Sequence, residues 1–121
     1  MWQNIPFQTK GINLRALLIQ PYLNLAFVQI KSTQYADAIK PSSSVLELEE
    51  HLSDSDKARA LYRRGMAYGQ SREEDLAVED LEKALEWCPN DVGIANGLNA
   101  MRARQKLKRE KERTAYGKMF S

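Results

Sequence analysis

Two arginines, Arg59 and Arg63, are the side chains whose type and spacing best fit a defined chemistry. Residues that are four positions apart in a helix lie on the same face, so both guanidinium groups would point in the same direction. A guanidinium group donates charge-assisted hydrogen bonds that match the shape of a carboxylate. The pair could therefore hold an acidic ligand, and the alternative is an ordinary charged surface in contact with water.

The other residues that could bind a metal or take part in catalysis do not form a pattern. His51 and Cys88 stand alone, without a second metal-type ligand at a suitable spacing, so loop and packing roles suffice for them. We find no Gly-rich phosphate loop and no nucleophile motif in the sequence. We therefore expect no catalytic residue, no metal site and no cofactor, and we do not expect this chain to be an enzyme.

The segment that carries the arginine pair, Lys57–Pro89, has the pattern of a helical hairpin. Its small and large apolar residues recur at spacings of three or four within each half, which places them on one face of each helix. These residues are Leu61, Gly65, Tyr68, Ala77, Leu81 and Ala84. The pattern resembles that of a tetratricopeptide repeat, whose period is about 34 residues.

Local signals in this segment support the same interpretation. Gly65 costs roughly 0.5 to 1 kcal/mol inside a helix relative to alanine, so we expect it to allow close packing with the second helix. The stretch from Tyr68 to Ser71 resembles a turn, with Ser71 placed to cap the second helix. Pro89 indicates where that helix ends.

The region 13–56 resembles an earlier, imperfect copy of this repeat. Leu23–Ala26 corresponds to Tyr62–Gly65, and Ala38 corresponds to Ala77, at an offset of 39 residues. The excess over the usual period can be placed in a polar loop at residues 49–56. This region is therefore predicted to form a second-type repeat with an extended loop, followed by a complete repeat at residues 57–90.

Proline residues disturb both predicted helices of the earlier repeat. Residues 1–12 show no period and are predicted to be irregular, and a helix is expected from about Asn13, its cap, to Lys31. Pro21 would kink that helix or mark its true start. The second helix, Gln34–Leu48, contains Pro41 followed by three serines, which are poor helix-interior residues. We expect this repeat to be the weaker one.

After Pro89, a long helix is predicted from Asp91, its cap, to about Met119, within a C-terminal region 91–121. Apolar residues as far as Leu107 would pack on the preceding repeat as a terminal cap. The basic part, Arg102–Lys118, could bind calmodulin or nucleic acid. Glu110 and Glu112 interrupt its positive charge, so we do not expect nucleic acid as a partner, and a solvated capping helix is the favoured interpretation.

Length and composition limit the class of protein. A chain of 121 residues with a formal charge of +2 fits one domain rather than several. The longest mostly apolar run, Leu14–Ile30, contains too many polar residues for a membrane span of about 20 apolar residues. The N-terminus lacks the features of an export signal, and one cysteine agrees with a reducing compartment. We expect a cytoplasmic protein without membrane contact.

Three stretches, ALYRRGMAY, DLAVEDLEKA and KERTAYGKMF, resemble the repeat domain of large immunophilins, most closely the cyclophilin-40 type. The resemblance covers roughly Leu17–Phe120. It implies an all-α fold in which two tetratricopeptide-repeat hairpins, the first imperfect, are followed by a long C-terminal capping helix. In that family an isomerase domain precedes three repeats. The sequence is expected to lack that domain and the first repeat.

The resemblance also implies a ligand and a set of contact residues. The family's repeats bind the acidic Glu-Glu-Val-Asp tail of heat-shock protein 90 through a carboxylate clamp, and the tail of heat-shock protein 70 is the alternative ligand. Asn24, in LNLA, matches the amide of the second repeat, and Arg63, in LYRRG, matches the arginine of the third. Arg59 stands where a lysine is usual. The clamp residues of the first repeat have no counterpart, so the resemblance implies a partial clamp.

Two further hypotheses follow from the same pattern. The chain could be a truncated product with a weakened clamp. The surface that a first repeat would have covered, near Leu17, Leu18 and Leu25, could drive self-association, because an exposed apolar face often marks an interface.

Overall fold

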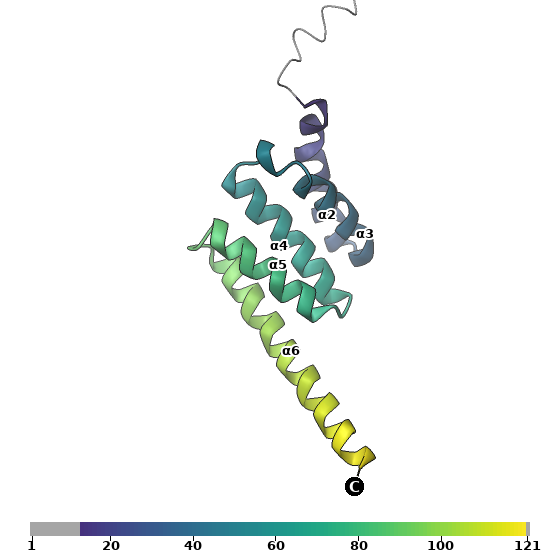
Figure 1. Ribbon diagram of the computed structural model, residues 1–121. Helices are drawn as coiled ribbons and strands as arrows, with labels where there is room; N and C mark the ends of the chain where they lie inside the picture. The colour runs from purple at the N-terminus through teal and green to yellow at the C-terminus, as the bar shows by residue number, and fades with distance from the viewer. Residues whose placement is uncertain (1–12, 121) are drawn as a thin grey trace, which may run out of the picture.

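A computed structural model describes residues 13–120, and all of its regular elements are helical (Figure 1). In chain order these elements are η1 (Leu14–Leu18), α2 (Ile19–Lys31), α3 (Tyr35–Leu46), η2 (Glu49–His51), α4 (Asp54–Gln70), α5 (Glu74–Trp87) and α6 (Val92–Met119). The predicted all-α fold is confirmed. The predicted irregular residues 1–12 lie outside the described part.

The helices form two hairpins and a projecting last helix. α2 pairs with α3, α4 pairs with α5, and α3 packs against α4 to join the two hairpins. The first part of α6 packs on α5, and the rest extends away from the body (Figure 1). This is the predicted arrangement of two repeats and a long capping helix.

The offset of 39 residues is visible in the backbone. α2 and α4 end at Lys31 and Gln70, which are 39 positions apart. In the loops that follow, Thr33 has a φ of 60° and Arg72 a φ of 67°. Both loops therefore reverse the chain through a left-handed residue at the same place, although neither residue is a glycine.

The predicted turn at Tyr68–Ser71 is wrong. α4 continues to Gln70, and the Ser71 N–H donates a hydrogen bond of 3.1 Å to the Ala67 oxygen. Ser71 thus caps the end of α4 instead of the start of α5, which has no side-chain cap. The turn comes later because Gly69 lies in a packed part of the helix, where an added Cβ would meet the side chain of Met101.

α3 forms a helix despite Pro41. The proline is buried inside the helix, and the serines after it satisfy their own polar groups. Ser42 Oγ donates to the Ala38 oxygen at 2.9 Å, and Ser44 Oγ donates to the Lys40 oxygen at 3.1 Å. These bonds within the helix allow a serine to occupy the core, where the corresponding position of the second hairpin holds Leu81.

The first predicted helix begins near Asn13, but only its part from Ile19 onward is an α-helix. The Asn13 side chain accepts a hydrogen bond from the Arg15 N–H and caps a short 3-10 helix, after which α2 begins at Ile19. Pro21 therefore lies in the first turn of α2, where a missing N–H removes no internal hydrogen bond. The sequence left two alternatives, a kink at Pro21 or a helix that truly starts near it, and the structure shows the second.

Close contact between α4 and α5 depends on Gly65. A Cβ at this position would lie 3.0 Å from Leu81 Cγ and 3.3 Å from the Ala77 oxygen, and no larger residue fits without movement. Leu81 and Ala77 are both fully buried. The packing role predicted for Gly65 is confirmed.

A buried ion pair accompanies this contact. Arg64 Nε lies 2.7 Å from Asp80 Oδ2, and Arg64 Nη2 lies 2.8 Å from Asp80 Oδ1. Arg64 Nη1 also donates to Ser43 Oγ at 3.4 Å. The hydrogen bonds to Asp80 raise the pKa of Arg64 above its usual value. Arg64 therefore links α3, α4 and α5, and it faces a different surface from Arg63.

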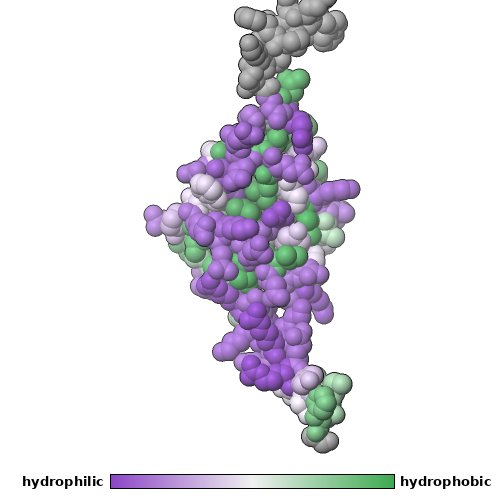
Figure 2. All heavy atoms as spheres, viewed as in Figure 1, coloured by the Kyte–Doolittle hydropathy of each residue, from purple (hydrophilic) through white to green (hydrophobic). Residues whose placement is uncertain are grey.

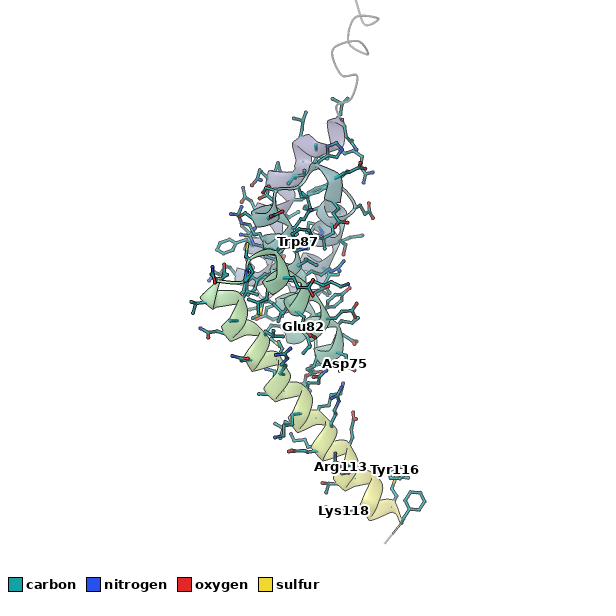
Figure 3. The ribbon with its side chains drawn as sticks, turned by 60° about the vertical axis from the view of Figure 1, so that its left-hand side comes forward. Asp75, Glu82, Trp87, Arg113, Tyr116 and Lys118 are labelled. Atoms are coloured by element: carbon teal, nitrogen blue, oxygen red, sulfur yellow. The ribbon has the colours of Figure 1, made fainter. Side chains whose placement is uncertain are left out.

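α6 begins as predicted, but it packs over a shorter stretch than expected, because Leu107 is 53% exposed. Asp91 Oδ1 accepts a 3.0 Å hydrogen bond from the Ile94 N–H, and Ile94 and Met101 are buried. Farther along, Arg102 pairs with Glu82 of α5, one of the acidic residues of α5 labelled in Figure 3. None of the helices within residues 13–120 is long and apolar enough to cross a membrane.

Replacing Gly65 by valine is expected to reduce the free energy of unfolding by about 1 to 3 kcal/mol, because the branched side chain would overpack the contact with Leu81. The matched control is Gly117→Val, since nothing lies within 4 Å of a Cβ at that position. Urea denaturation followed by circular dichroism measures both variants. Equal stability of Gly65→Val and the unmodified protein would contradict the close contact.

Candidate functional site

A groove of about 390 Å³ runs between α2, α4 and the start of α6. Its cationic lining residues come from two helices: Lys31 from α2, and Arg59 and Arg63 from α4. Apolar side chains lie beside these cations. They are Phe27, Ile30, Ala58, Met66 and Ile94. The groove thus combines positive charge with apolar surface.

Helical spacing explains how each helix presents these side chains. On α2, Phe27 and Lys31 are four positions apart, and on α4, Arg59 and Arg63 have the same spacing. Each pair therefore lies on one helix face. Neighbouring positions of both helices are buried in the core, namely Leu23 and Ala26 on α2, and Leu61 and Gly65 on α4. Packing of the hairpins therefore orients the two faces toward the groove.

Arg63 is held in place by α2. Its Nη1 donates a short hydrogen bond to the backbone oxygen of Leu23, and its guanidinium carbon lies 5.2 Å from the centre of the Phe27 ring. Partial burial and the nearby positive charge of Arg59 lower the pKa of Arg63 from its usual value. The arginine remains charged. Because burial and the Arg59 charge both disfavour that charge, an anion at this position would be favoured.

Arg59 is more exposed and less strongly held. Its Nη1 lies 3.4 Å from Asp56 Oδ1, one turn earlier on α4. The other Asp56 oxygen accepts a 3.1 Å hydrogen bond from Gln20 Nε2. Exposed ion pairs of this kind contribute about 0 to 1 kcal/mol, so a carboxylate in the groove could replace Asp56 as the partner of Arg59 at little cost.

Asn24 does not line the groove. Its side chain is exposed on α2, one turn before Phe27, on the side of the helix that leads into the groove. The structure therefore brings Arg59 and Arg63 together and leaves Asn24 at the edge. The contact role assigned to Asn24 stays a prediction.

Sequence reasoning missed Lys31 and Phe27. The Lys31 Nζ atom lies 5.5 Å from the centre of the Phe27 ring, and both residues line the groove. A signal was present in the sequence, because Asn24, Phe27 and Lys31 follow the spacing of a single helix face. One carboxylate, Asp91, also lines the groove, but it accepts the hydrogen bond that caps α6.

The hairpin of α4 and α5 matches a known repeat family. Residues 58–91 fit the family model described as tetratricopeptide repeat. This match covers most of both helices, including Arg59, Arg63 and the close contact at Gly65.

Proteins named peptidyl-prolyl cis-trans isomerase D are similar to most of the chain. The protein from Eremothecium gossypii is 39% identical over 109 residues, which cover 89% of this chain and 29% of that protein. The protein from Kluyveromyces lactis is 35% identical over 106 residues, which cover 88% of this chain and 28% of that protein. The protein from Cryptococcus neoformans is 46% identical over 70 residues, which cover 58% of this chain and 19% of that protein.

The chain spans less than a third of the length of these relatives. The similarity covers 89% of the chain, so it also includes parts of the first hairpin and of α6. The resemblance to the cyclophilin-40 type, suggested by the sequence, is confirmed. This chain is therefore an all-α protein whose residues 58–91 match the tetratricopeptide repeat, and which is similar over most of its length to part of the peptidyl-prolyl cis-trans isomerases D.

Proposed function

We propose that this chain is a protein-interaction module that binds an acidic C-terminal peptide in the groove between α2, α4 and α6. The observation that carries the proposal is the convergence of Lys31, Arg59 and Arg63 on one groove. The Glu-Glu-Val-Asp tail of heat-shock protein 90 has the matching chemistry, because it carries side-chain and terminal carboxylates. The tail of heat-shock protein 70 shares this chemistry and is a second possible ligand.

Arg63 is the central contact in this proposal. Its bond to the Leu23 oxygen and its position over Phe27 fix the guanidinium group before a ligand arrives. A preorganised donor loses less conformational entropy on binding than a free side chain does. Burial and, secondly, the positive charge of Arg59 lower the pKa of Arg63, so a carboxylate between the two arginines would relieve their repulsion.

The remaining groove residues fit the other parts of such a peptide. Lys31 would contact a second carboxylate from the α2 side, and Asn24 at the groove edge would donate to the peptide backbone or to a side chain. Phe27, Met66 and Ile94 offer apolar surface for the valine. These contacts form a partial carboxylate clamp. If the chain binds the peptide tail of such a chaperone, we expect to find the chain in the cytoplasm.

The projecting part of α6 supports a second candidate function, binding to calmodulin. Figure 2 shows a mostly hydrophilic surface along this part and hydrophobic atoms at its end. Tyr116, Met119 and Phe120 are exposed there, and the rings of Tyr116 and Phe120 are 4.9 Å apart. A basic helix with spaced apolar residues is the type of segment that calmodulin binds.

Titration calorimetry with a peptide ending in Glu-Glu-Val-Asp is expected to show binding that weakens as salt increases, because surface charges are screened. Arg63→Ala should weaken binding by about ten- to a hundredfold, since hydrogen bonds between charged groups contribute about 1.5 to 3 kcal/mol. The matched control is Arg113→Ala, which removes an exposed arginine from the far part of α6 (Figure 3).

Two results would contradict the peptide-binding proposal. One is the absence of binding heat with protein that circular dichroism shows to be folded. The other is an equal loss of affinity in Arg63→Ala and Arg113→Ala, which would indicate attraction to the overall charge of the protein.

The Lys31→Ala variant is expected to bind the same peptide about three- to tenfold more weakly, because Lys31 is an exposed cation that contributes less than a half-buried arginine. Lys40→Ala is the control, since Lys40 is an exposed lysine of α3 that does not line the groove. Competition measured by fluorescence anisotropy compares the two. Unchanged peptide affinity of Lys31→Ala would show that α2 contributes no cation to peptide binding.

A further inference from the structure

Asp56 is a carboxylate of the chain itself that neutralises one of the two arginines of the groove. Its Oδ1 atom lies 3.4 Å from Arg59 Nη1, and its Oδ2 atom accepts a hydrogen bond of 3.1 Å from Gln20 Nε2. Arg59 belongs to α4 and Gln20 belongs to α2, so the carboxylate joins the two helices that form the walls of the groove. Both of its oxygens therefore have a partner before any ligand binds.

The side chain of Asp56 is shielded from water and fixed in position. Only 19% of it is exposed, against 66% for Glu47 and 60% for Glu79, the acidic members of two other ion pairs. The Asp56 N–H donates a hydrogen bond of 3.1 Å to Ser53 Oγ, which caps the start of α4. A shielded carboxylate is screened less by salt, and a preorganised one loses less conformational freedom when it holds a cation. Asp56 is therefore suited to compete with a ligand for Arg59.

The two groove arginines consequently differ before a ligand arrives. Arg63 donates to the backbone oxygen of Leu23, which carries no net charge, so Arg63 keeps its attraction for an anion. Arg59 already has a carboxylate within 3.4 Å. A peptide carboxylate at Arg59 must displace Asp56 or approach against the negative charge of Asp56, and like charges at short range repel each other. Either way, Asp56 reduces the free energy that Arg59 contributes to binding.

We propose that Asp56 is an internal competitor of the peptide, which occupies Arg59 in the absence of ligand and lowers the affinity of the groove for acidic C-terminal peptides. Asp56 acts through Arg59, so it is a positioning residue and not a contact of the peptide. Because the peptide is what Asp56 competes with, this role rests on the proposed function. It reverses the expectation for a contact residue, since removing the charge of Asp56 strengthens binding.

Titration calorimetry of the full chain with a peptide ending in Glu-Glu-Val-Asp tests this role. About 150 mM salt is used, because it screens charges that are more than about 8 Å apart. Asp56→Asn keeps the shape of the side chain and removes its charge, and it should lower the dissociation constant about two- to fivefold, the range expected for one partly exposed ion pair. The matched control is Asp54→Asn, which removes the same charge from an exposed residue in the same turn of α4 and should leave the affinity nearly unchanged.

A double-mutant cycle with Arg59→Ala separates the action of Asp56 on Arg59 from a general effect of charge. In the Arg59→Ala background, Asp56→Asn should strengthen binding no more than Asp54→Asn does. Three results would overturn the role of Asp56 and leave peptide binding intact: no gain in affinity from Asp56→Asn, an equal gain from Asp54→Asn, or the same gain with and without Arg59. If neither the unmodified protein nor Asp56→Asn binds the peptide, both the role of Asp56 and the proposed function are wrong.

Discussion

The close approach of α4 to α5 at Gly65 is the constraint on which the rest of the structure depends. With no side chain at this position, Leu81 and Ala77 of α5 pack directly against the backbone of α4. The Arg64–Asp80 pair lies next to this contact and extends it to α3 through Ser43. Once α4 is held in this orientation, its other side turns Arg59 and Arg63 toward α2 and α6. The groove is therefore a consequence of how the hairpin packs.

Features that depend on local spacing could be predicted from the sequence. The apolar positions of the Lys57–Pro89 hairpin, the packing role of Gly65 and the capping role of Asp91 each follow from residues a few positions apart. The offset of 39 residues also identified the first hairpin, because Leu23–Ala26 and Tyr62–Gly65 carry the same pattern. The sequence also predicted that Arg59 and Arg63 share one helix face, because they are four positions apart.

Features that depend on tertiary contacts could not be predicted in this way. The end of α4 at Gln70 depends on Gly69 packing near Met101, which is 32 positions away, and on a left-handed conformation at Arg72. Helix propensity argued against α3, yet Pro41 and Ser42 are accommodated because the serine bonds within its own helix. Lys31 and Phe27 were missed because their contribution to the groove depends on how one hairpin packs on the other.

The structure separates three surfaces of different chemistry. The groove between α2 and α4 is cationic, the outer side of α2 is apolar and uncharged, and the projecting part of α6 is basic with an apolar end. α2 contributes to two of these surfaces, because Phe27 and Lys31 line the groove and Leu25 and Val28 are exposed beside them.

Mapping of backbone amide chemical shifts by NMR during titration with an acidic C-terminal peptide tests the central claim most directly. Binding in the groove predicts that the largest shifts fall on the facing residues of α2 and α4, around Lys31, Arg59 and Arg63, and on the first turn of α6. Shifts concentrated on the projecting half of α6, or no shifts at saturating peptide, would contradict the assignment of the groove as the binding site.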